Sequence, residues 1–88
     1  MLAAIMSANA FEMAVRAIGS YRAIGALFDP PISVQAVAKW VSAGVPPERV
    51  IAVAAAAGFR PSPHELRPDL YPHPDDGLPE ELRGRATA

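Results

Sequence analysis

The segment PPISVQAVAKWVSAGVPPERV, residues 30–50, places one short helix between two pairs of prolines. Ser33 is suited to begin that helix, because a serine hydroxyl accepts a hydrogen bond from one of the first free amides. Gly44 is suited to end it. Helical spacing puts apolar side chains on one side and small or polar ones on the other. The apolar side holds Val37, Trp40 and Val41, and the other side holds Gln35, Ala38, Lys39 and Ser42. The sequence therefore predicts an amphipathic helix over residues 33–43 with an outer face that is free to bind.

Length and composition indicate one soluble domain. With 88 residues, of which 51% are hydrophobic, the chain is long enough for a core of its own. It has no cysteine, which excludes disulfides and thiolate metal sites and fits a reducing compartment. The longest apolar run, residues 50–59, is about half as long as a membrane span, and the apolar start lacks a basic leader. We therefore expect a cytoplasmic protein with no membrane partner.

The charge is unevenly distributed along the chain. The net charge of −1 argues weakly against nucleic acid, because proteins that bind duplexes usually carry a basic excess. Residues 1–68 hold six Lys or Arg against four Asp or Glu, whereas residues 69–88 hold two against five. The sequence thus predicts a mildly basic domain followed by an acidic tail, and the charge balance by itself decides nothing.

Composition and the positions of proline and glycine divide the chain into three segments. Residues 1–7 are expected to form an N-terminal extension, residues 8–72 the folded domain, and residues 73–88 a mobile, acidic and proline-rich tail with almost nothing to bury.

Helix signals recur through the domain. Asn9 followed by Glu12 predicts a capping box for a first helix, Ser20 a cap for a second, and Ser62 with Glu65 a last short turn. The side chains expected to point inward from the first, second and fourth helices are Phe11, Val15, Ile18, Ile24, Leu27, Phe28, Val50, Val53, Ala54 and Ala57. Gly25 lowers helix propensity, which predicts another helix crossing directly over it. No useful strand pattern occurs, so the class is all-α, with four to five helices in a compact domain.

A capped helix with a polar outer face, preceded by a small residue in the helix before it, is the helix-turn-helix pattern. Its outer residues suit a DNA major groove, since Gln pairs with adenine, Lys with guanine or phosphate, and small apolar side chains touch a thymine methyl. The candidate DNA contacts of this helix are Ser33, Val34, Gln35, Ala38, Lys39 and Ser42. The start of the second helix adds Ser20, Tyr21 and Arg22, which would hold phosphates.

The same residues also have ordinary structural explanations. Gln and Lys on an exposed helix face are commonly just solvated, and Trp40 is in phase with the core rather than with the outer face. His64 and His73 have no carboxylate or cysteine partner at ligand spacing, which argues against a metal site. Arg49 is expected to be structural or to contact phosphate. We expect no enzymatic activity and no cofactor, because no nucleophile–base pair, phosphate-binding glycine loop or carboxylate cluster is present in the predicted domain.

Two longer motifs carry a resemblance to a known family. SVQAVAKWVSAGVPPERVIAVAAAAG, which begins at Ser33, and SPHELRPDLYP, which begins at Ser62, together resemble the YdaS/Cro-like helix-turn-helix family of bacterial antitoxins and phage-type repressors. The resemblance spans about residues 10–72 and implies a lambda-repressor/Cro-like fold that binds double-stranded DNA. The connection DPPI is longer than the family's usual turn, which is expected to alter the angle of the helix after it. In the second motif, Leu66, Leu70 and Tyr71 are expected to cover the core, and Arg67 to pair with Glu65.

The resemblance implies a Cro-like repressor or an autoregulating antitoxin. A domain this small reads few bases, so we expect a homodimer on a pseudo-palindromic operator. The alternative is a protein-interaction module on the same fold, which binds a toxin or another regulatory protein.

Overall fold

The computed structural model describes the backbone of residues 2–84 and the side chains of residues 9–84. Five α-helices and two short 3₁₀ turns follow one another along the chain, and no strand occurs within the described range, which confirms the all-α class. They are α1 (Leu2–Ile18), α2 (Tyr21–Gly25), α3 (Val34–Ala43), η1 (Pro47–Arg49), α4 (Val50–Ala56), α5 (Pro63–Leu66) and η2 (Glu80–Leu82). None of the helices in this range combines the length and apolar character needed to cross a bilayer.

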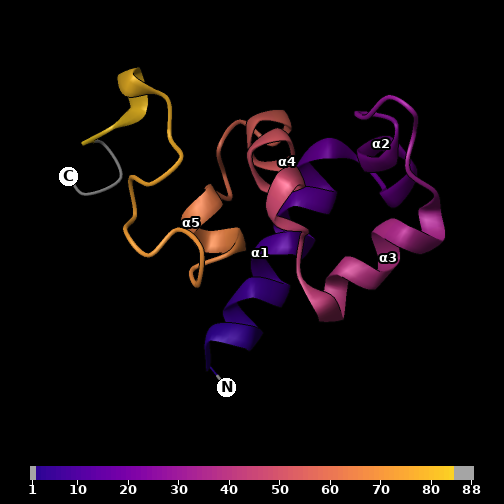
Figure 1. Cartoon of the computed structure of the whole chain (residues 1–88), viewed down its shortest axis with the longest axis horizontal. Coiled ribbons are helices and arrows are strands. Elements are labelled where there is room, and N and C mark those ends of the chain that lie inside the picture. The colour runs from indigo at the N-terminus through magenta and orange to yellow at the C-terminus, as the bar shows by residue number, and fades with distance from the viewer. Residues whose placement is uncertain (1, 85–88) are drawn as a thin grey trace.

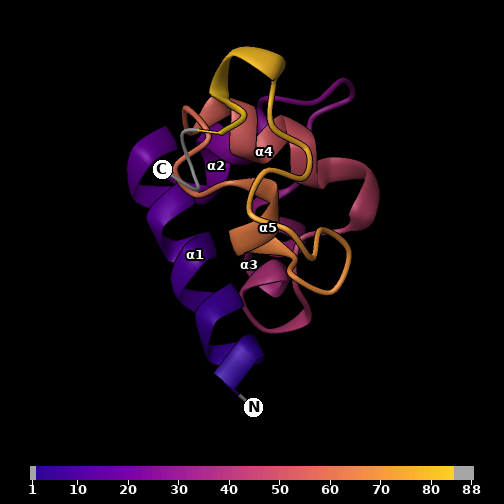
Figure 2. The same ribbon diagram turned by 90° about the vertical axis from the view of Figure 1, so that its left-hand side faces the viewer.

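Helix α1 is the longest element, and α2, α3 and α5 all pack against it (Figures 1 and 2). The capping box predicted at Asn9 is wrong, because α1 already begins at Leu2 and runs through that position. The preceding residues are rich in alanine, leucine and methionine, which favour helix strongly enough to override a local capping signal. Residues 2–7 of the expected extension therefore form the first turns of α1.

Three of the predicted caps are confirmed. The amide of Ala23 donates to the Ser20 hydroxyl oxygen over 3.0 Å, and the amide of Ala36 donates to that of Ser33 over 3.2 Å. At Ser62 the box is reciprocal, since its hydroxyl oxygen accepts from the Glu65 amide while its own amide donates to a Glu65 carboxylate oxygen over 2.9 Å. These bonds satisfy amides that have no partner inside their helices, so local sequence fixes where α2, α3 and α5 begin.

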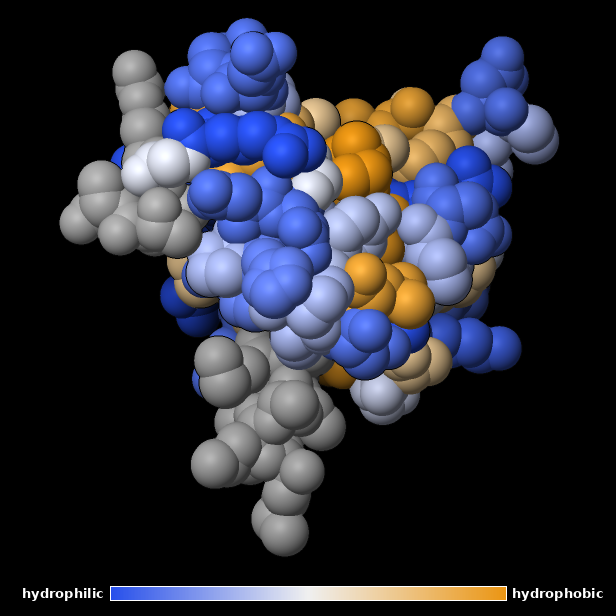
Figure 3. Space-filling view, turned by 60° about the vertical axis from the view of Figure 1, so that its left-hand side comes forward, coloured by the Kyte–Doolittle hydropathy of each residue, from blue (hydrophilic) through white to orange (hydrophobic). Residues whose placement is uncertain are grey.

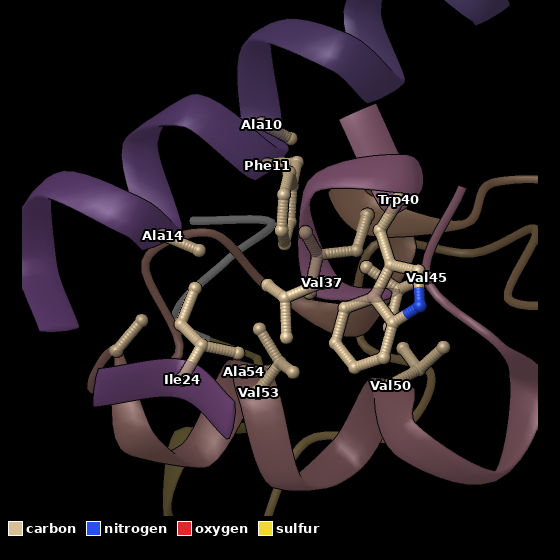
Figure 4. Close-up of a cluster of buried hydrophobic side chains, with 12 residues drawn as sticks. Ala10, Phe11, Ala14, Ile24, Val37, Trp40, Val45, Val50, Val53 and Ala54 are labelled. Carbon is tan, nitrogen blue, oxygen red and sulfur yellow. The ribbon is translucent and has the colours of Figure 1, made fainter. Parts of the chain in front are cut away.

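The core is centred on Trp40, whose side chain is 7% exposed (Figure 4). Its ring meets Phe11 of α1 edge-on at 6.2 Å between centroids and Phe28 of the connection after α2 at 6.4 Å. The other buried hydrophobic residues of this cluster are Ala10, Phe11, Ala14, Ile24, Val37, Val45, Val50, Val53, Ala54, Ala57 and Leu66. Leu27, expected inside, is 44% exposed, because α2 ends at Gly25 and the next residues leave its helical phase.

Another segment of backbone approaches Gly25 closely. The residue that approaches it is Ile32, in the connection between α2 and α3, and not a residue of another helix as predicted. The Ile32 amide donates to the Gly25 carbonyl over 3.0 Å, and a Cβ at Gly25 would overlap the main-chain oxygen of Ile32. The absent side chain therefore lets the connection fold back onto α2 just before α3 begins.

The C-terminal part of the described chain is more closely packed than its composition predicts. Leu78 is 7% exposed, so the expectation that this segment buries almost nothing is wrong at that residue. The Leu78 carbonyl accepts from the Arg83 Nε, and Gly77 lies against the ring of Pro63 with no room for a side chain. The whole segment 75–84 lies on the side of the molecule away from α3 (Figure 1).

Replacing Trp40 tests the centre of this core. Trp40→Ala removes the ring that joins α1, α3 and the connection, so we expect it to cost about 3–5 kcal/mol in the free energy of unfolding. That is a large fraction of the stability of a small domain. Urea unfolding followed by circular dichroism measures the loss, and Trp40→Phe, which keeps an aromatic ring, should cost less. An unchanged urea midpoint for Trp40→Ala would show that the ring does not hold the core together.

Candidate nucleic-acid interface

Helix α3 separates an anchored side from an exposed side. Val37 is fully buried and Trp40 nearly so, which fixes the inner side against α1 and α2. The predicted contact residues on the other side are exposed at Ser33, Val34, Gln35, Lys39 and Ser42, and partly buried at Ala38. In Figure 1, α3 forms an outer edge of the molecule. The structure thus brings these six residues to one exposed surface, and their contact with DNA stays a prediction.

Two long polar side chains on this surface are available for a ligand. Among the residues whose side chains are described, 9–84, none forms a hydrogen bond or ion pair with the Gln35 amide or the Lys39 ammonium. They lie one helical turn apart, so both project from the same side of α3. Ser42, one turn beyond Lys39, donates weakly to the Lys39 carbonyl over 3.5 Å.

The candidate residues of α2 have different surroundings. The Ser20 hydroxyl oxygen is occupied as the cap of α2. The Tyr21 ring is half-buried and stacks on Phe11 with centroids 6.4 Å apart, so most of this side chain serves the core. Arg22 is exposed, which leaves its guanidinium free to face solvent. Since α2 packs against α3, this cation lies on an element adjacent to the exposed surface of α3.

Arg49 has a structural contact. Its guanidinium carbon lies 4.6 Å from the centroid of the Phe28 ring, in the geometry of a cation–π interaction. Because Phe28 also packs edge-on against Trp40, Arg49 joins η1 to the connection that precedes α3. No local spacing signal marks this pair, since the two residues lie far apart in the sequence.

Arg67 binds the segment that follows the C-terminal end of α3. Its guanidinium donates two hydrogen bonds to the carboxylate of Asp69, over 2.9 and 2.7 Å, and a third to the main-chain oxygen of Val45 over 2.7 Å. The predicted pair with Glu65 is wrong, because that carboxylate caps α5 instead. Hydrogen bonding to Arg67 lowers the pKa of Asp69, and the same contact raises the pKa of Arg67.

The remaining residues of the second motif divide between core and surface. Leu66 is buried and Tyr71 packs against the core as predicted, but Leu70 is 42% exposed, so the expectation that it covers the core is wrong. The Nδ1 of His64 lies 2.7 Å from the main-chain oxygen of Tyr71. Across the described side chains, no three His, Asp or Glu residues come close enough together to hold a metal ion.

One comparison with known proteins found a match. The model of a family described as bacterial toxin YdaS matches residues 11–75, from Phe11 in α1 through the turn after α5. No curated protein and no solved structure matches the chain. The matched range contains all of α2, α3, α4 and α5, and hence every residue of the surface described above.

The Arg67–Asp69 pair predicts a dependence of stability on pH. Because the pKa of folded Asp69 is lowered, the pair stabilises the fold above about pH 4, the ordinary pKa of an aspartate. This contribution is lost as the pH falls through the lowered pKa. We expect Asp69→Asn to cost less than about 1 kcal/mol at pH 7, since the Asp69 side chain is 60% exposed.

Urea unfolding of both proteins at pH 7 and pH 3 measures this effect. The difference between wild type and Asp69→Asn should be smaller at pH 3. A difference that stays the same at both pH values would contradict an ionic origin.

Proposed function

Because the chain belongs to the bacterial toxin YdaS family, we propose that it is a sequence-specific DNA-binding regulator that reads the major groove with α3. The observation that carries this proposal is the pairing of a rigidly anchored inner side of α3 with two unpartnered polar side chains, Gln35 and Lys39, on its outer side. A helix held in this way can present base-reading groups without further ordering of its backbone.

The side chains of the exposed surface suit different contacts. Gln35 lies in the first turn of α3, the end that enters the groove in helix-turn-helix proteins, and can bond both N6 and N7 of adenine. Val34, which is 38% exposed, can touch a thymine methyl group. Lys39 can reach guanine or a phosphate, and Arg22 on α2 is a candidate for a phosphate contact.

The position of the acidic segment, residues 75–84, supports the proposed binding of DNA despite the net charge of −1. Four of the nine acidic residues of the chain, Asp75, Asp76, Glu80 and Glu81, belong to the segment on the side away from α3. Their field at α3 is weakened by distance and by salt, since exposed charges more than about 10 Å apart are largely screened at moderate ionic strength. The few cations near α3 nevertheless predict only a modest contribution of phosphate contacts to affinity.

We further propose that the protein acts as a homodimer on a pseudo-palindromic operator, as an autoregulating repressor or antitoxin. One α3 touches few base pairs, and two copies related by a two-fold axis double the number that is read. The second candidate is a protein-interaction module, and the family's description as a toxin, together with the mixed charge of the chain, favours it. In that case binding to a partner protein, rather than to DNA, would depend on the exposed surface of α3.

Two substitutions on α3 separate base reading from phosphate binding. On an operator selected from random DNA, Gln35→Ala should cost about 1–3 kcal/mol and relax the preference at one base pair. Lys39→Ala, if this side chain holds a phosphate, should weaken binding to all sequences alike and reduce the salt slope by about one. Fluorescence anisotropy with labelled duplexes at several salt concentrations measures both effects.

The controls use the same positions. Lys39→Arg keeps the positive charge and should retain the salt slope, and the melting temperatures of all variants should equal that of wild type, because both side chains are exposed. If the double variant Gln35→Ala/Lys39→Ala bound the selected operator as tightly as wild type at one salt concentration, α3 would not be the reading helix. The interaction module would then be the better explanation.

A further inference from the structure

A small pocket opens at the C-terminal end of α3, and of the six residues of α3 and its cap assigned to DNA contact only Ser42 lines it. It has a volume of about 200 Å³. Its floor is apolar and formed by Phe11, Trp40, Val45 and Leu66, and its wall includes Arg67 and Asp69. Gln35 lies at the other end of α3, so an occupant of this pocket would leave the reading end of the helix free.

The pocket contains a hydrogen-bond donor without an acceptor. The Trp40 ring is more than nine-tenths buried, yet its indole nitrogen makes no hydrogen bond with any described residue. Figure 4 shows this nitrogen on the side of the ring towards Val45, a residue of the pocket floor, and away from Ile24. The indole nitrogen is not one of the fully buried side-chain atoms that lack a partner, so it keeps contact with solvent, and an oxygen atom of an occupant can replace water as its acceptor.

The charges of the pocket are already neutralised within the chain. The guanidinium of Arg67 is bound by both carboxylate oxygens of Asp69 and by the Val45 carbonyl. The occupant should therefore be uncharged, with a compact apolar group for the floor and a carbonyl for the indole. Sites for drug-sized ligands begin at about 300 Å³, so this pocket suits a single apolar side chain with its peptide group.

The chain carries such a side chain beside the pocket. The large hydrophobic residues with exposed side chains in the described range are Met13, Leu27, Val34, Ile51 and Leu70. Of these, Leu70 alone directly follows a residue of the pocket wall, Asp69, and it is 42% exposed. On the face seen in Figure 3, apolar residues form areas that hydrophilic residues border.

We propose that this pocket receives Leu70 of a second copy of the chain, with a main-chain carbonyl beside that leucine accepting from the Trp40 indole. Leu70 directly follows a residue of the pocket wall, so leucine and pocket can pair reciprocally, and a two-fold axis between the two copies closes the assembly. Each Arg67–Asp69 pair carries no net charge, so the two pairs can approach across this axis with little net repulsion. This inference rests on the proposed function, because a two-fold operator requires two copies of the chain. It adds the surface through which the two copies contact each other.

The single tryptophan of the chain makes the test direct, because Trp40 lies in the pocket and is the only source of indole fluorescence. The full-length protein is studied by sedimentation equilibrium and by fluorescence over a concentration series. Wild type should dimerise, and its Trp40 emission should shift to longer wavelength as dilution exposes the pocket. Leu70→Asp should raise the dissociation constant of the dimer at least about hundredfold and give the monomer emission throughout.

Leu27→Asp is the matched control, because Leu27 is exposed to a similar extent, 44%, and is remote in sequence from the pocket wall. It should dimerise as wild type does. If Leu70→Asp has a lowered melting temperature, Leu70→Ala, which adds no charge, replaces it in the comparison. A Leu70 variant with the same dissociation constant as wild type would overturn the proposal.

Two further outcomes separate this proposal from the function proposed above. A wild-type protein that stays monomeric up to about 1 mM overturns the dimer surface, and if a capped leucine peptide then shifts Trp40 emission, the occupant is another protein. A Leu70-dependent dimer that selects no DNA sequence supports this surface and contradicts the DNA-binding function. Loss of affinity for a two-fold operator in Leu70→Asp, with affinity for a half-site retained, supports both.

Discussion

The position of Trp40 between Phe11 and Phe28 is the contact on which the rest of the structure depends. These three rings join α1, the connection after α2, and α3 at centroid distances of 6.2 and 6.4 Å. A helix of ten residues such as α3 is marginal in isolation, so packing of its inner side must supply most of its stability. Arg49 extends the same cluster through its contact with Phe28 and thereby attaches the segment that leads into α4.

A main-chain contact then determines where α3 starts. The connection between α2 and α3 is longer than usual for a helix-turn-helix, yet its end is fixed because the Ile32 amide bonds to the Gly25 carbonyl. Ser33 follows immediately and caps α3. The extra residues of the connection therefore lie before Ile32, and the outer side of α3 has a defined position relative to α2. The proposed reading of DNA depends on this arrangement.

Local signals were predictable from the sequence, and long-range contacts were not. The caps at Ser20, Ser33 and Ser62 and the inner side of α3 follow from spacing within a few residues, and the structure confirms them. The capping box predicted at Asn9 is wrong because helix-favouring residues precede it. Leu70 was assigned to the core because it is apolar, but the sequence does not show to which side its side chain points. The contact of Arg49 with an aromatic ring, like the tertiary approach to Gly25, depends on segments that only the folded chain brings together.

The two sides of α3 have an evolutionary consequence. The side chains of Val37 and Trp40 are buried in the core, whereas those of Gln35 and Lys39 make no contact on which folding depends. Mutations on the outer side can therefore accumulate at little cost in stability, while those on the inner side are removed by selection for a folded chain. Descendants of one such protein could acquire new binding preferences through a few substitutions on a single helix, and an engineer could vary the same positions on an unchanged scaffold.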